Sequence, residues 1–249
     1  MCFELDSLPP IPVLSGGAVA HEDLVLEAGD GAQFAAFAAL PDEPSAVGIV
    51  VLPDVRGLYR FYEELALRFA ERGYAAVAID YFGRTAGVGK RDDDFPYMEH
   101  VQQTTPENTQ ADVAAAVTWL RSRGYDSMFT VGFCFGGRNS WLAATGGHGL
   151  AGAIGLYGMP GERNGTPGPT QRAAEIAAPI LALQAGDDKN ITAEHNSAFD
   201  EALTAAGVEH EVVTYEGAPH SFFDRKQEEF ADASTDAWGR VLEFIERHR

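Results

Sequence analysis

Short apolar runs alternate along this chain with longer segments in which apolar positions recur every three or four residues. Residues 46–52, 127–133 and 178–185 form short apolar runs that end in turn-forming residues, as buried strands do. Helical spacing marks the segments between and after these runs, at residues 61–72, 106–123, 192–206 and 227–248. This alternation predicts an α/β fold with a mostly parallel sheet and helices on both faces.

The first part of the chain has a different pattern. Residues 24–26 and 32–38 flank a turn at residues 28–31, which predicts an antiparallel hairpin at the sheet edge. Two further segments, residues 82–105 and 157–178, contain Gly and Pro and lack clear periodicity. We interpret them as pocket walls or lids, with plain surface excursions as the alternative for most of their length.

The chain has 249 residues and contains no internal repeat or low-complexity segment. That length fits one large α/β sheet with insertions, so we expect a single domain over residues 1–249. The pattern does not decide between a monomer and a small homo-oligomer.

The overall charge is strongly acidic. There are 18 Lys and Arg residues against 37 Asp and Glu residues, giving a formal net charge of -19. Such a field repels phosphate backbones and anionic lipids, so we expect no nucleic-acid or membrane partner. No apolar run reaches the roughly 20 residues of a membrane-spanning helix, and residues 1–6 lack the basic start of a secretion signal. We therefore expect a cytoplasmic protein.

One of the two cysteines lies in a motif that can carry chemistry. Cys134 lies between Gly132 and Gly136, after a predicted strand and before a helical segment at residues 138–144. This is the G-x-S-x-G turn of a nucleophile elbow with sulfur in place of oxygen, which favours a nucleophilic thiol over a buried structural cysteine. Cys2 is the second cysteine, and one mobile terminal thiol beside a nucleophile predicts no disulfide framework.

An acid and a histidine follow Cys134 in the order that such hydrolases use. Asp187 and Asp188 occupy the turn after the apolar run at residues 178–185, and either could be the acid. His220 lies in a Gly-Ala-Pro-His turn after the predicted strand at residues 211–215. The other six histidines do not follow a late strand; they are His21, His100, His148, His195, His210 and His248.

Together these motifs resemble the dienelactone hydrolases of the α/β-hydrolase superfamily. The resemblance covers nearly the whole chain and rests on residues 73–80, 132–137, 186–191 and 218–222. It implies the α/β-hydrolase fold and a catalytic triad of Cys134, Asp188 and His220. Asp188 is chosen over Asp187 because the family's acid ends a Gly-x-Asp turn and is followed three places later by an apolar residue, here Ile191.

The resemblance also implies an acidic residue close to the resting thiol, in the loop after an early strand. That place falls on Asp54, where many members have the longer Glu. Asp54 could modulate the Cys134 thiol, pair with a nearby arginine, or form a turn or helix cap.

If the substrate is the anionic lactone that the family implies, cations must offset the negative field at the pocket. The candidates are Arg84, Arg138 and Arg225. The family's carboxylate-binding arginine stands four residues after the histidine, whereas Arg225 stands five after His220. For Arg138 the alternative is a structural contact with a carboxylate such as Asp54.

These residues predict a mechanism. A thiol with a pKa of about 8.5 is mostly protonated at neutral pH, so His220, oriented by Asp188, would take its proton. The backbone N–H groups of Phe135 and Val55 would bind the oxyanion, and a thioester on Cys134 would then be hydrolysed. We expect a small-molecule ester or lactone substrate and no metal or organic cofactor.

A thiolate leaves more readily than an alkoxide, so activated enol esters and enol lactones suit this site better than alkyl esters. Two alternatives stay open. One is a broad esterase acting on short activated esters without an anionic-substrate requirement. The other is a non-catalytic or redox-sensing protein in which Cys134 is reversibly oxidised.

Overall fold

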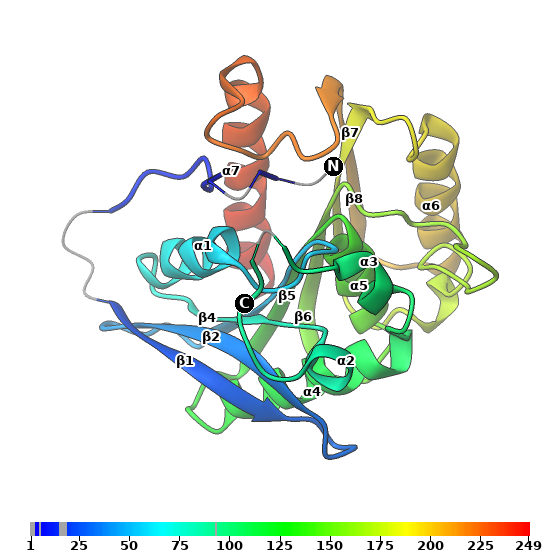
Figure 1. Ribbon diagram of the computed structural model, residues 1–249. Coiled ribbons are helices and arrows are strands. Elements are labelled where there is room, and N and C mark those ends of the chain that lie inside the picture. Colours follow the sequence, from blue (N-terminus) through cyan, green and yellow to red (C-terminus); the bar gives the residue numbers. More distant parts are fainter. Residues whose placement is uncertain (1–2, 5, 15–18, 93) are drawn as a thin grey trace.

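A mixed sheet forms the centre of the molecule (Figure 1). The computed structural model describes residues 3–4, 6–14, 19–92 and 94–249, and these form eight strands in the order β1-β2-β4-β3-β5-β6-β7-β8. Their bounds are β1 (Val19–Glu27), β2 (Gln33–Pro41), β3 (Val47–Leu52), β4 (Ala75–Ile79), β5 (Ser127–Phe133), β6 (Leu150–Leu156), β7 (Ile180–Asp187) and β8 (His210–Pro219). The β1–β2 hairpin is antiparallel, β2 is antiparallel to β4, and the other pairs are parallel. The predicted α/β-hydrolase architecture is confirmed.

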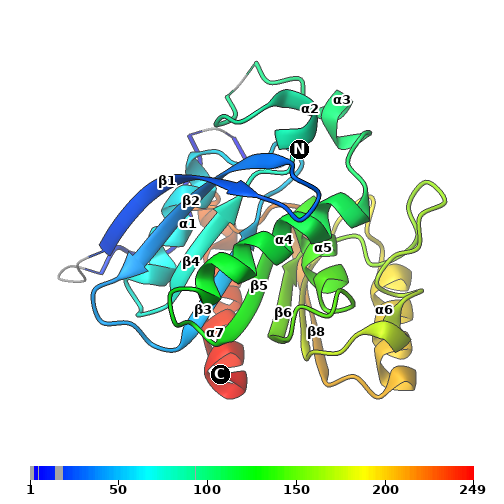
Figure 2. The ribbon, with the colours of Figure 1, turned by 90° about the horizontal axis from the view of Figure 1, so that it is seen from below.

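Helices cover both faces of this sheet. On one face lie α1 (Arg60–Ala70) and α7 (Ala231–His248), whose apolar stripes share one core cluster. The other face is covered by α4 (Pro106–Arg121), α5 (Phe135–Ala143) and α6 (Ala193–Ala206), as Figure 2 shows. The short helices α2 (Gly83–Ala86) and α3 (Tyr97–Val101) lie in the connection between β4 and α4. Short 3-10 turns occur at Ala173–Glu175 and Glu228–Phe230.

Strand β6 has no counterpart in the hydrophobic pattern, and its neighbours explain why. A side chain at Gly152 would come within 2.5 Å of the Phe244 ring, and one at Gly155 within 2.4 Å of the Trp141 ring. Large aromatic groups from the helices therefore fill the space beside this strand. Four of its seven residues are Gly or Ala, so its sequence lacks the unbroken bulky apolar run that marks a buried strand.

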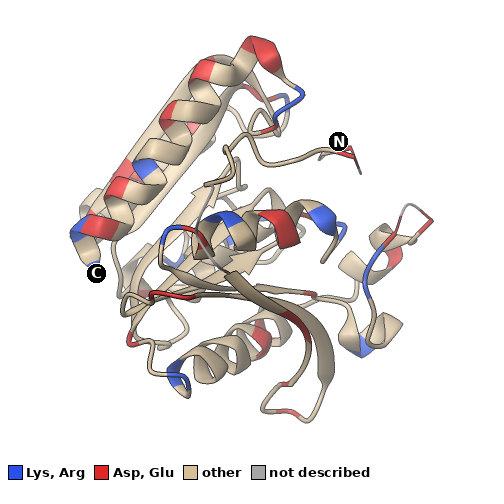
Figure 3. Ribbon diagram, turned by 90° about the vertical axis from the view of Figure 1, so that its left-hand side faces the viewer, with Lys and Arg blue, Asp and Glu red and all other residues tan. Residues whose placement is uncertain are grey.

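Acidic residues extend over the helices that face the solvent. Figure 3 shows them in successive turns of α7, whose sequence contains two aspartates and two glutamates. Among the described residues, every helix is too short or too polar to cross a membrane.

Arg84 has a structural role, because its side chain links separate elements of the fold. Its Nη1 donates to both carboxylate oxygens of Asp112 on α4, at 2.7 and 2.8 Å, and the Asp112 side chain is 1% exposed. Its Nε and Nη2 donate to Asp30 in the β1–β2 turn, at 2.9 and 3.0 Å. This single side chain thus joins α2, α4 and the hairpin.

We expect Arg84→Gln to lower the free energy of unfolding by about 3 kcal/mol, because it leaves the buried Asp112 carboxylate without its ion-pair partner. Urea denaturation would measure the loss. Arg60→Gln is the matched control, since Arg60 is 70% exposed and contacts Glu64 only at 3.8 Å; we expect it to cost less than about 1 kcal/mol. Equal losses in the two variants would contradict this role of Arg84.

Candidate active site

Cys134 lies at the sharp turn between β5 and α5. Its φ angle is 55°, in the left-handed region that residues other than glycine seldom adopt. The glycines two residues before and after it allow close backbone contacts. A Cβ atom on Gly136 would lie 2.0 Å from the carbonyl oxygen of Leu52, and one on Gly132 would lie 2.0 Å from that of Gly136. The turn therefore requires glycine at both positions.

Asp188 and His220 meet at the same edge of the sheet. Asp188 follows β7 and His220 follows β8, and His220 Nδ1 lies 2.6 Å from Asp188 Oδ2. The other carboxylate oxygen accepts the N–H groups of Asn190 at 2.9 Å and Ile191 at 3.2 Å. Burial by itself would raise the pKa of Asp188, but the hydrogen bonds from His220 and these N–H groups hold it below its ordinary value. An ionised Asp188 accepts a hydrogen bond from the N–H group at Nδ1, which keeps the proton on that nitrogen and leaves Nε2 as the basic nitrogen. Asp187, beside it, is exposed.

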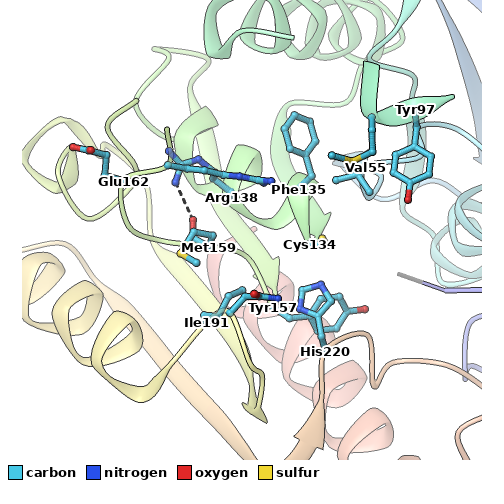
Figure 4. Close-up of a pocket in the computed structure, with 13 residues that line it drawn as sticks. Val55, Tyr97, Cys134, Phe135, Arg138, Tyr157, Met159, Glu162, Ile191 and His220 are labelled. Atoms are coloured by element: carbon cyan, nitrogen blue, oxygen red, sulfur yellow. Dashed lines mark hydrogen bonds between the residues drawn. The ribbon is translucent and has the colours of Figure 1, made fainter. Parts of the chain in front are cut away.

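Cys134 and His220 line one cavity of about 610 Å³. Figure 4 shows His220 and Tyr157 on one side of Cys134, and Phe135 and Val55 on the other. Phe135 is the first residue of α5, where backbone N–H groups have no partner within the helix. The two residues predicted to bind an oxyanion therefore border the cavity that holds the thiol.

Both irregular segments of the sequence supply walls of this cavity. Tyr97 and Met98 of α3 come from the first segment, within which residue 93 lies outside the described residues. Met159 and Arg163 come from the second. Sequence reasoning did not single out any of these four side chains, because wall residues follow no periodic pattern. Tyr157 was also missed, although it directly follows β6; its φ is 39° and its ring centre lies 5.0 Å from that of His220.

Asp54 is fully buried and hydrogen-bonded within its own loop. Its Oδ1 accepts the Arg56 N–H at 2.8 Å, and its Oδ2 accepts Arg56 Nη2 at 3.2 Å and the Tyr59 hydroxyl at 3.0 Å. Two of the three roles considered for Asp54 describe this geometry: it pairs with an arginine, Arg56, and it forms a turn. These bonds fix the loop that carries Val55. Modulation of the Cys134 thiol by Asp54 stays a prediction.

Arg138 is held by backbone carbonyls, so the predicted contact with Asp54 is wrong. Nη1 donates to the carbonyl of Met159 at 3.1 Å and to that of Gly161, and Nη2 donates to those of Thr166 and Pro167, both at 3.1 Å. Arg138 also lines the cavity. Arg138 contacts carbonyls and not Asp54 because its guanidinium points from α5 into the curved segment of residues 159–167.

The structure does not bring Arg84 or Arg225 to this cavity. Arg84 is bound by Asp30 and Asp112, as described above. Arg225 donates its N–H to the Leu8 carbonyl and its Nη2 to the Ile11 carbonyl, both at 3.0 Å, and thereby holds the N-terminal segment. Cys2 lies outside the described residues. Within the described ranges, no three His, Cys, Asp or Glu side chains are grouped as a metal site would require.

Several known proteins are similar to this chain in sequence or in fold. The model of the dienelactone hydrolase family matches residues 34–249. A carboxymethylenebutenolidase from Rhodococcus opacus is 29% identical over 267 residues, covering 100% of this chain and 97% of its own. A solved structure from Klebsiella pneumoniae, assigned as a dienelactone hydrolase, is 27% identical with a TM-score of 0.79, covering 92% of this chain and 99% of its own. A Pyrococcus horikoshii acylaminoacyl peptidase, 16% identical with a TM-score of 0.75, covers 92% of this chain and 42% of its own, and it shares the fold.

We expect Gly136→Ala to displace the turn that presents Cys134, because the added methyl group would collide with the rigid carbonyl of Leu52. The expected result is a melting temperature at least several degrees lower and slower alkylation of the Cys134 thiol by iodoacetamide. Gly239→Ala in α7 is the control, since a Cβ there meets nothing within 4 Å. An unchanged alkylation rate in Gly136→Ala would contradict the steric argument.

The lowered pKa of Asp188 predicts a pH dependence of stability. A carboxyl whose pKa is lower in the folded state stabilises the fold above its unfolded pKa, and this stabilisation is lost as the pH falls through the folded value. We expect Asp188→Asn to cost about 2 kcal/mol at pH 7 and progressively less below about pH 4. Urea denaturation between pH 7 and pH 3 would test this, with Asp187→Asn as the exposed control. A difference that does not shrink at low pH would oppose this explanation.

Proposed function

The chain belongs to the dienelactone hydrolase family, and on that premise we propose that it hydrolyses enol lactones or activated carboxylic esters through a thioester on Cys134. The observation that carries the proposal is the shared cavity. It brings together a cysteine at a strained strand-to-helix turn and a histidine whose Nδ1 is 2.6 Å from a buried aspartate. This geometry supports the roles of nucleophile for Cys134, base for His220 and orienting acid for Asp188.

Acylation would begin with transfer of the Cys134 proton to Nε2 of His220. The sulfur then bonds to the carbonyl carbon, and the carbon–oxygen bond to the leaving group breaks. The leaving oxygen takes its proton from His220 unless it departs as a stabilised enolate. The charged Asp188 stabilises the imidazolium that exists between these two proton transfers. The partial positive charge at the start of α5 also favours the thiolate over the thiol.

The tetrahedral intermediate needs donors aimed at its negative oxygen. The backbone N–H groups of Phe135 and Val55 are suited to this task, because both residues border the cavity beside Cys134. Asp54 contributes indirectly, since its bonds to Arg56 and Tyr59 hold the loop that carries Val55. Losing one such donor would cost roughly 3 kcal/mol of transition-state stabilisation.

Deacylation would use a water molecule in place of the leaving group. Once its first proton has passed to the leaving oxygen or to solvent, the neutral His220 removes a proton from the water, and the water oxygen attacks the thioester carbon. The carbon–sulfur bond then breaks, and the departing sulfur takes that proton from His220, which regenerates the enzyme. In the tetrahedral intermediate of the earlier acylation step, a poor alkoxide leaving group would allow the thiolate to be expelled first, and the substrate would then re-form. Enol and aryl esters, whose oxygen leaves readily, therefore suit this site best.

A broad short-chain carboxylesterase is the second candidate function. The observation that favours it is the position of Arg84 and Arg225, since neither lines the cavity and both are engaged elsewhere. The triad chemistry would be the same in both cases. The two functions differ in whether an anionic group on the substrate increases the rate.

We expect hydrolysis of a dienelactone and of p-nitrophenyl acetate to fall by at least about a thousandfold in Cys134→Ala and in His220→Ala. Mass spectrometry of acid-quenched wild type should find an acyl group on the peptide that contains Cys134. His195→Ala is the matched control, because His195 lies in the first turn of α6 and bonds to Thr192. Acetate turnover without dienelactone turnover would favour the broad esterase, and full activity in Cys134→Ala would exclude the proposed mechanism.

A further inference from the structure

The N-terminal part of the chain packs against the loop that follows His220. Residues 6–12, which we call the N-terminal strap, lie beside the loop of residues 221–227 between β8 and α7 (Figure 1). Arg225 makes two of the contacts, because its N–H donates to the Leu8 carbonyl and its Nη2 donates to the Ile11 carbonyl, both at 3.0 Å. Ile11 itself is fully buried. Two segments that are far apart in the sequence are therefore packed as one unit beside the proposed base.

Ser7 and Asp224 join the strap to this loop in the protein interior. The Ser7 hydroxyl donates to Asp224 Oδ2 at 2.6 Å, and the two residues are 0% and 5% exposed. Asp224 Oδ1 accepts the Lys226 N–H at 3.1 Å. Removing the Ser7 hydroxyl would leave a buried carboxylate oxygen short of a donor, so the loop would have to move to solvate it.

The loop needs such support because it begins with a strained residue. Ser221 directly follows His220 and has a φ angle of 64°, and within the described part of the chain its buried hydroxyl has no hydrogen-bond partner. Strained backbone of this kind persists only where surrounding contacts fix it. Gln227 Nε2 donates to the Ser221 carbonyl at 2.7 Å, and the Gln227 N–H donates to the Asp224 carbonyl at 3.1 Å. Through Gln227 and Ser221, the contacts of Asp224 thus reach the backbone beside His220.

Phe3, which precedes the strap, supports an aromatic ring that contacts His220. It is 3% exposed and stacks on Phe61, with the ring centres 3.9 Å apart. Its ring centre also lies 6.4 Å from that of Tyr157, and the Tyr157 ring centre lies 5.0 Å from that of His220. Edge-to-face and stacked contacts of this kind fix the positions of the rings. Phe3 therefore braces the ring against which His220 packs.

We propose that the N-terminal strap and Phe3 position the active site, and that Ser7 is a positioning residue that acts through Asp224. Together they hold the His220 ring in line with the Asp188 carboxylate, where Nδ1 lies 2.6 Å from Oδ2. That alignment keeps the proton on Nδ1 and leaves Nε2 as the base. The inference rests on the proposed hydrolase function, because it gives the strap a role in the same proton transfers.

The kinetics of Ser7→Ala, in the full chain, test the effect on catalysis. His220 acts in both acylation and deacylation, so a displaced ring slows both steps while the pocket that binds the substrate stays intact. With p-nitrophenyl acetate we therefore expect kcat to fall about tenfold and KM to change by less than about twofold. Ser197→Ala is the matched control, because the Ser197 hydroxyl also donates to a carboxylate, that of Glu201 at 3.3 Å, but on the exposed surface of α6. We expect it to keep the wild-type kcat.

Two Phe3 variants give a second route if Ser7→Ala does not fold. Phe3→Ala removes the ring that supports Tyr157 and should lower kcat by a similar factor. Phe3→Leu fills most of the same space and should retain most of the wild-type kcat. Val13→Ala is the control for these variants, since Val13 lies just beyond the strap and is 60% exposed. Circular dichroism establishes that each variant is folded at the assay temperature.

Nitrogen-15 NMR of the histidine rings tests the alignment independently of hydrolysis. The spectra are recorded in the Cys134→Ala background, so that no thiolate holds the ring protonated, and at about pH 8, where a histidine of ordinary pKa is neutral. The His220 signals are those that disappear in His220→Gln. We expect the tautomer protonated on Nδ1 when Ser7 is present, and a mixture of both ring tautomers when Ser7→Ala is added.

The two measurements separate this proposal from the proposed function. An unchanged His220 tautomer in folded Ser7→Ala would overturn the positioning role, and so would an unchanged kcat in Ser7→Ala if Cys134→Ala is inactive. An altered tautomer together with full hydrolysis in Cys134→Ala would support the positioning role and refute the thioester mechanism alone. Loss of hydrolysis in Cys134→Ala with an unaltered tautomer in Ser7→Ala would support the mechanism and refute the positioning role.

Discussion

The close contact between the first turn of α5 and the end of β3 is the constraint on which the candidate site depends. Gly136 lets the α5 backbone approach the carbonyl of Leu52, and Gly132 lets it approach β5. That approach forces Cys134 to a φ of 55° and turns its side chain away from the sheet. It also sets Phe135 beside the loop that follows β3. The proposed nucleophile, the helix N-terminus and the proposed oxyanion donors are thus placed by one packing contact.

Arginine side chains organise what surrounds this contact, each in a different way. Arg84 binds two carboxylates and joins the short helix α2 to α4 and to the β1–β2 turn. Arg56 binds Asp54 and stiffens the loop beside the thiol. Arg138 binds only carbonyls, so its charge is not cancelled by a neighbouring acid. In a chain with a net charge of -19, an arginine that lines the pocket and has no carboxylate partner, as Arg138 does, can alter the potential inside it.

The fold could be predicted wherever local pattern and packing agree. Strands β5 and β7 follow from unbroken apolar runs, because both of their faces are covered. The helices α1, α4, α6 and α7 follow from helical periodicity, because each buries one apolar face. Strand β6 could not be found in this way, since its glycines make room for Trp141 and Phe244, which are distant in sequence. The short helices α2 and α3 bury no residue of their own, so they carry no periodic signal.

By itself, the sequence determined the order of most elements and placed Cys134, Asp188 and His220 each after a strand, here β5, β7 and β8. The ends of parallel strands meet at one sheet edge, so the three residues were expected to lie together. Only the tertiary structure decided which arginine has which neighbours. The arginine side chain is long, and its guanidinium group can bind either carboxylates or carbonyls. Its partner therefore depends on which loop folds back within reach. Arg84 and Arg225 therefore became structural, Arg138 bound the segment at residues 159–167, and Arg163 came to line the cavity that holds Cys134.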